Sequence, residues 1–164
     1  MNRRHLFAAL ALVLTACTKP DPPRLTPLSA KVTAISPQGI DVDVKLEAEN
    51  PNESALSARS LTATITLDGR YVLGTVTVPH QIKLPAHQKT VLDVPVASRW
   101  QDLSGLAALA MAGKDVPYTI DGTVQLGGET LSVAVPFSVA GIVTREQLAQ
   151  AALSSLPKIP GLLR

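Results

Sequence analysis

From residue 28 onward, apolar and polar residues alternate along the chain with a period of two, as they do in β-strands that bury one face. The clearest alternating runs are 40–49, 61–68, 71–78, 92–96, 118–126 and 131–139. Tight turns are predicted between two pairs of these runs, at Asp68-Gly69 and at Gly127-Gly128. Because short strands follow one another with little helix between them, the pattern predicts an all-β fold, an antiparallel β-sandwich of about seven or eight strands.

Pro95 lies within one of the alternating runs and refines this prediction. Proline has no amide hydrogen to donate to a neighbouring strand, so the strand at 92–96 is expected at a sheet edge or paired on one side only at this residue. A short separate segment at 80–84 is expected between that strand and the one at 71–78.

The period changes to that of a helix in two places. The segment 101–112 predicts one short inserted helix, with Asp102 as its cap and Gly113 at its end. The face of this helix that we expect to be buried consists of Leu103, Leu106, Ala107 and Ala110. Thr144-Arg145-Glu146-Gln147 matches a capping box, which predicts a short C-terminal helix through about Ser154.

The N-terminal segment 1–16 has the features of a secretory signal. A basic start is followed by an apolar run at 6–14, which is too short to span a membrane. Small residues then precede the only cysteine of the chain, and together they resemble the lipobox of bacterial lipoproteins. The residues of this motif are Leu14, Thr15, Ala16 and Cys17. The alternative is an ordinary cleaved signal followed by an incidental cysteine.

The lipobox resemblance implies that Cys17 is acylated and becomes the N-terminus of a lipid-anchored protein. Several acyl chains hold a protein firmly, so membrane lipid is the expected partner of this residue. Thr18 stands where an aspartate would favour the inner membrane, so we expect the bacterial outer membrane, facing the periplasm. Proline is frequent in the rest of 17–28, which we interpret as a semi-rigid spacer that holds the following domain off the lipid.

Composition argues against several classes of function. The formal net charge of +2 disappears when Arg3 and Arg4 leave with the signal, because 13 basic and 13 acidic residues then remain. A neutral domain without a basic run gives no support to nucleic-acid binding. Aromatic residues make up 3% of the chain, so stacking surfaces for bases or sugars are poorly supplied.

No group of residues in the sequence favours an enzyme. His80 and His87 flank a proline turn at a spacing that matches no zinc site, and we expect them in surface loops. Four acidic residues on one strand face are expected to be solvated, since they lack the loop of a calcium cage: Asp41, Asp43, Glu47 and Glu49. Without a phosphate-binding glycine loop or a catalytic triad, the sequence predicts no catalytic residues, no metal and no cofactor.

A long alternating strand that leads into Asn50-Pro51-Asn52 resembles the late embryogenesis abundant type 2 family, with its water stress and hypersensitive response domain. Other stretches match in the same order: Tyr71-Val72-Leu73-Gly74, Ile82-Lys83-Leu84-Pro85-Ala86, Tyr118 to Val124, and Val135-Pro136-Phe137 with Gly141. The resemblance implies an immunoglobulin-like or fibronectin-like sandwich with a role in tolerance of desiccation, freezing or osmotic stress. The Asn50-Pro51-Asn52 motif itself is interpreted as structural, because Pro51 and Asn52 favour a change of chain direction.

These observations divide the chain into a signal peptide (1–16), a lipidated cysteine with spacer (17–28), the sandwich (29–143), and a C-terminal helix with an apolar tail (144–164). We expect a non-catalytic, membrane-anchored protein that shields envelope proteins or lipid during water loss and contacts protein clients weakly. The alternative is an envelope assembly or binding module that recognises a specific protein partner or an apolar ligand. The apolar tail either docks on the sandwich or contacts a membrane or a partner.

Overall fold

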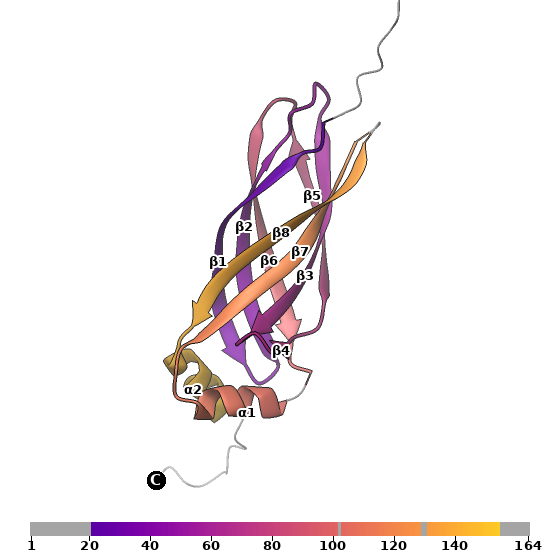
Figure 1. Ribbon diagram of the computed structural model, residues 1–164. Coiled ribbons are helices and arrows are strands. Elements are labelled where there is room, and N and C mark those ends of the chain that lie inside the picture. Colours follow the sequence, from indigo (N-terminus) through magenta and orange to yellow (C-terminus); the bar gives the residue numbers. More distant parts are fainter. Residues whose placement is uncertain (1–20, 102, 129–130, 155–164) are drawn as a thin grey trace, which may run out of the picture.

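The computed structural model describes residues 21–101, 103–128 and 131–154, which form two antiparallel sheets packed face to face with two helices at one end (Figure 1). The strands are β1 (Arg24–Ser36), β2 (Gly39–Glu49), β3 (Leu56–Leu67), β4 (Tyr71–Val72), β5 (Val76–Leu84), β6 (Lys89–Arg99), β7 (Val116–Gly127) and β8 (Ser132–Val143). The helices are α1 (Leu103–Met111) and α2 (Arg145–Ser154). The predicted all-β sandwich with two short helices is confirmed.

The two sheets differ in size and share one core. The smaller sheet has the order β1-β2-β6, and the larger has the order β4-β3-β7-β8 with β5 also paired to β3. In β2, every second residue from Ile40 to Ala48 is at most 1% exposed. The larger sheet supplies the opposite wall of the core through Leu61, Ile65 and Ile120, among others. Because side-chain direction reverses at each residue of a strand, one apolar face per strand fills a shared interior.

Neighbouring strands close both open sides of the sandwich. β1 lies beside β8 and β5 lies beside β6, although each pair belongs to different sheets. Within its sheet, β6 pairs only with β2, and its Pro95 lies opposite Asp43. The predicted edge position of this strand is therefore confirmed.

The strand predicted at 71–78 is divided in the structure. Between β4 and β5, Leu73 turns its side chain into the core, and its amide donates to a β3 carbonyl at 2.8 Å. The Gly74 carbonyl accepts a hydrogen bond from Ser98 Oγ of β6 at 3.0 Å, so the break connects the two sheets. β5 also includes the segment 80–84, which was expected to be separate.

The turn predicted at Asp68-Gly69 is confirmed, because both residues have positive φ angles, 51° and 67°. These angles match the twist that a short hairpin requires. At the second predicted turn, Gly127 ends β7 and the Gly128 amide donates to the Leu131 carbonyl at 2.8 Å. Residues 129–130, which follow, lie outside the described residues.

The predicted spacer is too long, because β1 already begins at Arg24. The last part of the predicted spacer, 24–28, pairs with β2, and Pro27 lies opposite Leu46 next to an irregularity in the register. Leu25 packs against the core. The frequency of proline concealed this strand, since an irregular edge strand tolerates a proline that a central strand would not.

The helices pack against each other beneath the sandwich (Figure 1). In α1, the prediction that Leu106 is buried is confirmed, but Ala107 is exposed and Leu109 is buried instead. Gly113 ends the helix with a φ of 61°, as expected, whereas the expected cap, Asp102, lies outside the described residues. The buried face is shifted because α1 packs on both α2 and the sheet end, so the strongest apolar side chains turn inward.

The capping box of α2 is confirmed. The Thr144 amide donates to Gln147 Oε1 at 3.0 Å, and the Gln147 amide donates to Thr144 Oγ1 at 3.3 Å. This reciprocal pair satisfies two amides at the start of the helix, which then runs to Ser154 as predicted.

Two aromatic rings lock β7 to β8 by lying over glycines of the neighbouring strand. Tyr118 pairs with Gly141, and Gly122 pairs with Phe137. A Cβ at Gly141 would overlap the Tyr118 ring, and a Cβ at Gly122 would lie 2.8 Å from Phe137 ring carbons. The Tyr118 hydroxyl donates to the Ala30 carbonyl of β1 at 3.0 Å, which ties the larger sheet to the smaller one.

We predict that Gly141→Ala lowers the free energy of unfolding by about 1–3 kcal/mol, because the added methyl group forces the Tyr118 ring from its place. Urea unfolding followed by circular dichroism measures this change. Gly74→Ala is the matched control, since a Cβ at Gly74 meets no atom within 4 Å. Equal stability of the two variants would contradict the packing role of Gly141.

Candidate functional site

The outer face of the smaller sheet carries the acidic residues that the sequence singled out, together with basic partners. Lys45 Nζ lies 2.5 Å from Asp93 Oδ2, and Lys89 Nζ lies 2.7 Å from Glu47 Oε1. The hydrogen bond to each carboxylate raises the pKa of Lys45 and of Lys89. Across 21–101, 103–128 and 131–154, no group of His, Cys, Asp and Glu has the arrangement of a metal site. This face is a mixed, paired surface whose ion pairs are exposed and weak.

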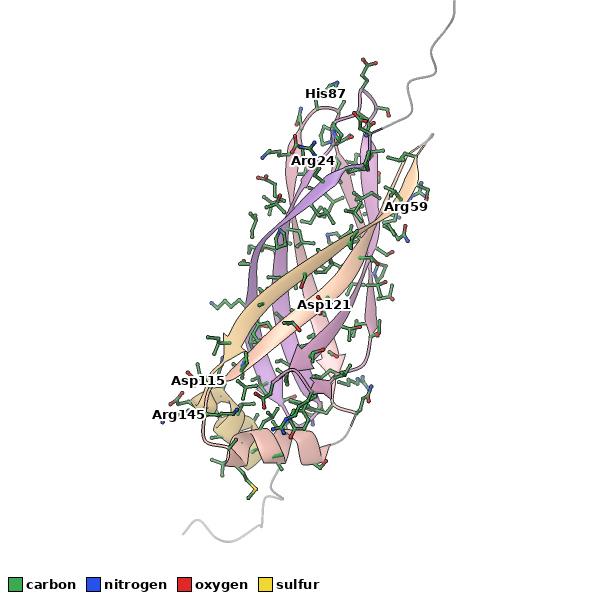
Figure 2. All side chains as sticks on the ribbon, viewed as in Figure 1. Arg24, Arg59, His87, Asp115, Asp121 and Arg145 are labelled. Carbon is green, nitrogen blue, oxygen red and sulfur yellow. The ribbon has the colours of Figure 1, made fainter. Side chains whose placement is uncertain are left out.

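The outer face of the larger sheet is chemically different, because it consists mainly of hydroxyl groups. Thr62 and Thr77 share a hydroxyl hydrogen bond of 3.2 Å, and Thr64 and Thr75 share one of 2.8 Å. Asp121 lies near the middle of this sheet (Figure 2) and accepts a 2.7 Å hydrogen bond from Ser138 Oγ. The face therefore offers side-chain hydroxyls and methyl groups around Asp121, while Arg59 and Lys83 add positive charge beside Ser57 and Gln81.

Asn50 is fully buried, follows the last residue of β2 and binds several segments at the end of the sandwich where β1 begins. This end lies opposite the helices (Figure 1). Its Nδ2 donates to the carbonyl oxygens of Ser54, Leu84 and Pro85 at 2.9, 3.1 and 3.2 Å. Its Oδ1 accepts from the Asn52 amide at 3.1 Å, and its own amide donates to the next loop at 3.0 Å. These bonds compensate the loss of hydration of a buried amide.

Asn52 holds the N-terminal segment against this loop. The Asp21 amide donates to Asn52 Oδ1 at 2.9 Å, and Asn52 Nδ2 donates to the Asp21 carbonyl at 2.9 Å. Asn52 Nδ2 also lies 3.1 Å from Asn50 Oδ1, so the two asparagines form one network. The network fixes the point at which the chain enters the sandwich.

The two histidines do not form a site together with an acid or a metal. His80 lies in β5 rather than in the expected surface loop, and its Nε2 is the one buried side-chain nitrogen or oxygen without a hydrogen-bond partner among the described residues. His87 is exposed in the loop after β5, has a φ of 53°, and lies at the Asn50 end of the molecule (Figure 2). Its amide donates to the Asn52 carbonyl at 3.3 Å.

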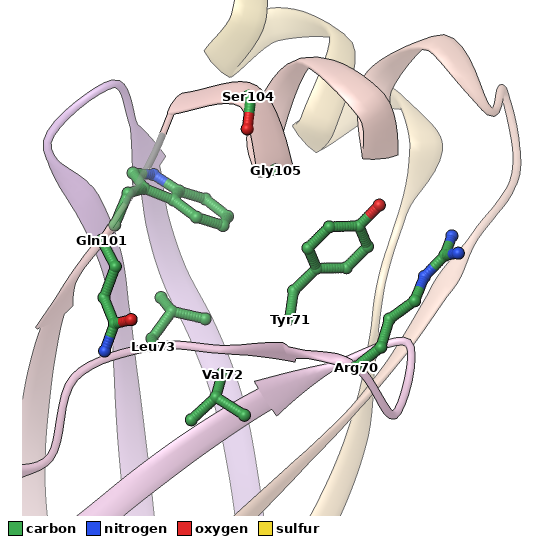
Figure 3. Close-up of a pocket in the computed structure, with 8 residues that line it drawn as sticks. Arg70, Tyr71, Val72, Leu73, Gln101, Ser104 and Gly105 are labelled. Carbon is green, nitrogen blue, oxygen red and sulfur yellow. The ribbon is translucent and has the colours of Figure 1, made fainter.

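A hollow of about 340 Å³ lies between the β4 segment and the start of α1 (Figure 3). Its lining includes Tyr71, Leu73, Trp100, Gln101 and Gly105. The sequence indicated a shortage of aromatic stacking surfaces, and the fold brings two aromatic residues distant in sequence to this one place. Their contact with the same hollow was not predictable from the period-two pattern, which does not report on the ends of strands.

Two comparisons with known proteins bear on the family. A model of the late embryogenesis abundant protein family LEA_2 matches residues 45–141. The chain belongs to this family. Family membership indicates a role related to water stress, and members of the family are generally not enzymes. No curated protein matches the chain significantly.

Solved structures show that the LEA_2 chain has a known fold. The solution structure of AT1g01470 from Arabidopsis thaliana is 20% identical, with a TM-score of 0.63, and the match covers 85% of this chain and 92% of that one. At2g46140.1, described as a late embryogenesis abundant (LEA) protein, is 20% identical with a TM-score of 0.59, covering 77% and 75%. A protein from Archaeoglobus fulgidus is 10% identical with a TM-score of 0.54, covering 73% and 97%.

Several sequence predictions fall on residues outside the described ones. The lipobox residues Leu14, Thr15 and Ala16, the anchor Cys17, and the tail from 155 onward are in this group. Among the helices of the described part, none is long and apolar enough to span a membrane.

We predict that Asn50→Asp lowers the free energy of unfolding by about 3 kcal/mol or more, because it places a carboxylate against three carbonyl oxygens in a buried site. Urea unfolding at neutral pH measures the loss. Asn52→Asp is the control: Asn52 is half-exposed, so its charge stays partly hydrated and the expected cost is about 1 kcal/mol. A larger loss for Asn52→Asp than for Asn50→Asp would contradict this ranking.

Burial raises the pKa of the Tyr118 phenol. The folded state thus holds this proton more tightly than the unfolded state, so the contribution of Tyr118 to stability is complete below about pH 10 and is lost as pH rises through the folded pKa. In a Tyr71→Phe variant, which has one tyrosine left, we expect the ultraviolet ionisation midpoint to be higher in the folded chain than in urea. Coincident midpoints would contradict the burial of the phenol.

Proposed function

We propose that this protein is a non-catalytic stress-protection protein, anchored in the bacterial envelope through Cys17, that shields envelope proteins or lipid during water loss. The observation that carries the proposal is the match to the late embryogenesis abundant family over residues 45–141. The lipobox resemblance of Leu14-Thr15-Ala16-Cys17 supports the anchor, with the outer membrane, facing the periplasm, as its location.

The Asn52–Asp21 contact supports a specific orientation at the membrane. Cys17 precedes Asp21 by four positions, so the two Cα atoms are at most about 14 Å apart along the chain. An acylated Cys17 would hold the Asn50 end of the sandwich close to the lipid. The segment between the anchor and the domain is therefore shorter than the spacer that the prolines led us to expect. β2 has 11 residues and is about 36 Å long at 3.3 Å per residue. The helices would thus face away from the membrane.

The hydroxyl face of the larger sheet supports the protective mechanism. Client proteins and lipid headgroups lose hydrogen-bond partners when water leaves, and exposed hydroxyls such as those of Thr77 and Thr119 can replace some of them. Where this face carries hydroxyls rather than charged groups, contact with a client costs little desolvation. The packed core beneath this face already holds the hydroxyls in place. Binding to a client therefore costs little conformational entropy in this protein.

The second candidate function is an envelope binding module. The aromatic hollow beside Tyr71 and Trp100 favours it, since protection through a hydroxyl face requires no hollow. Crosslinking separates the two functions: one stoichiometric partner indicates a module, while many weak clients indicate protection.

We predict that a strain without this gene survives drying less well, and that the wild-type gene restores survival while Cys17→Ala does not, because an unanchored protein is not held at the membrane. Counting viable cells after drying measures the effect. Restoration by Cys17→Ala would contradict the need for the anchor. Undiminished survival of the deletion strain, with no second family member in its genome, would contradict protection itself.

A charge variant tests the hydroxyl face in the same assay. Thr62→Lys with Thr119→Lys adds two charges to this face, and we expect it to restore survival less well than the wild type. Ser29→Lys with Thr33→Lys is the matched control, since it adds the same charges to exposed positions of β1 on the other sheet. Equal loss of survival in both variants would mean that the hydroxyl face has no special part.

A further inference from the structure

The aromatic residues of the described chain divide into two groups. Tyr118 and Phe137 are core residues, 2% and 6% exposed. Tyr71 and Trp100 are half-buried, and both line the hollow beneath the sandwich. In a chain with 3% aromatic residues, the meeting of both partly exposed rings at one hollow points to a surface for stacking.

The backbone around Tyr71 and Trp100 holds the two rings in place. Trp100 Nε1 donates to the Ser36 carbonyl at 2.8 Å, so the indole is fixed and its remaining edge and faces are apolar. A Cβ at Gly105 would lie 3.2 Å from Tyr71 Cδ1, so the backbone of α1 packs closely on the phenol ring. Figure 3 shows Leu73 below the space and Gly105 above it. Residues 73–75, between β4 and β5, belong to no strand, so the sheet is interrupted beside the hollow.

A second hollow of about 460 Å³ adjoins the first, and Trp100 and Gln101 line both. The segment 74–77 and Arg99 complete its wall. Each hollow has the volume of a typical small-ligand site, about 300–1,000 Å³. Gly74 lines the second hollow, and a Cβ there would meet no atom within 4 Å. A larger side chain at this position would therefore extend into the open space of the hollow.

The charge of the two hollows is positive. Their lining contains Arg70 and Arg99 and no acidic residue. Arg70 lies over the Tyr71 ring, 4.8 Å from its centroid, and pairs with Asp68 at 3.1 Å. Arg99 is exposed and forms no ion pair within the described part of the chain. A guanidinium group in this state binds carboxylate or phosphate in two-point geometry.

We propose that the two hollows form a binding site for a saccharide ring that carries an anionic group, either a carboxylate or a phosphate. The carbon–hydrogen face of the ring packs against Trp100, its hydroxyls bond to the Gln101 amide, and its anionic group binds Arg99. Such a ligand matches aromatic walls, a polar rim and a positive charge together. The site adjoins α1, at the end of the sandwich opposite the start of β1 (Figure 1), and its existence does not depend on the anchor or on protection.

Trp100 is the only tryptophan, so its fluorescence reports directly on this site. The purified full-length chain is titrated with a glucuronate-containing disaccharide, with glucose 1-phosphate and with maltose as the neutral probe. We expect a saturable change in emission with at least one anionic saccharide, and binding about tenfold weaker for maltose because the charge-assisted bond to Arg99 is absent. Tighter binding of the uronate or of the sugar phosphate identifies the source of the anionic group.

Three variants locate the binding. Arg99→Gln should weaken it about tenfold, and Gly74→Leu should abolish it by filling the second hollow. Arg59→Gln is the matched control, since Arg59 lines a separate hollow with Ser57, Gln81 and Lys83 and without an aromatic residue; it should leave affinity unchanged. Thermal unfolding of each variant verifies that the chain is folded before titration.

Four results would overturn the proposal. The first is no saturable change with either anionic saccharide. The second is equal affinity for maltose, which removes the role of the charge. The third is a loss of affinity in Arg59→Gln as large as in Arg99→Gln, which would mean that general surface charge attracts the ligand. Tighter binding of ADP than of any saccharide would also overturn it, in favour of a nucleotide site.

Discussion

The alternation of side-chain direction along a β-strand is the constraint on which the rest of this structure depends. Every long strand presents one apolar face, and no such face can be buried except against the other sheet. Since the chain has a single cysteine, no intrachain disulfide can assist this packing. The stability of the domain therefore comes from the fit between two sheets, and the aromatic–glycine contacts of β7 and β8 are part of that fit.

Side-chain hydrogen bonds fix the chain at the two ends of the sandwich, where the strands and their apolar pattern stop. At one end, the buried Asn50 amide joins three carbonyl groups from two segments of the chain, and Asn52 fixes the entry of the chain. At the other end, α1 and α2 cover the core, and a capping box begins α2. The two ends thus have different chemistry, one a network of asparagine bonds and the other a helical cover beside an aromatic hollow.

This asymmetry gives the proposed functions separate places on the molecule. The entry of the chain at Asp21 lies at the asparagine end, which suits attachment to a surface through the preceding segment. The broad outer faces between the ends differ as well, because one carries paired charges and the other carries hydroxyl groups. A contact through a broad face and a ligand in the aromatic hollow use different residues and do not compete.

The sequence by itself determined most of the strands and of their buried faces, the edge position of the Pro95 strand and the capping box of α2, because these features depend on local period and local hydrogen bonds. It also identified the family through short motifs. Tertiary structure decided what depends on pairing between distant segments: the start of β1 at Arg24, the break at Leu73, and the inward turn of Leu109. It also brought Tyr71 and Trp100 to one hollow. These residues are 29 positions apart and meet because two strand ends and a helix converge there. The periodicity of the sequence reports local secondary structure only and cannot predict such a long-range contact.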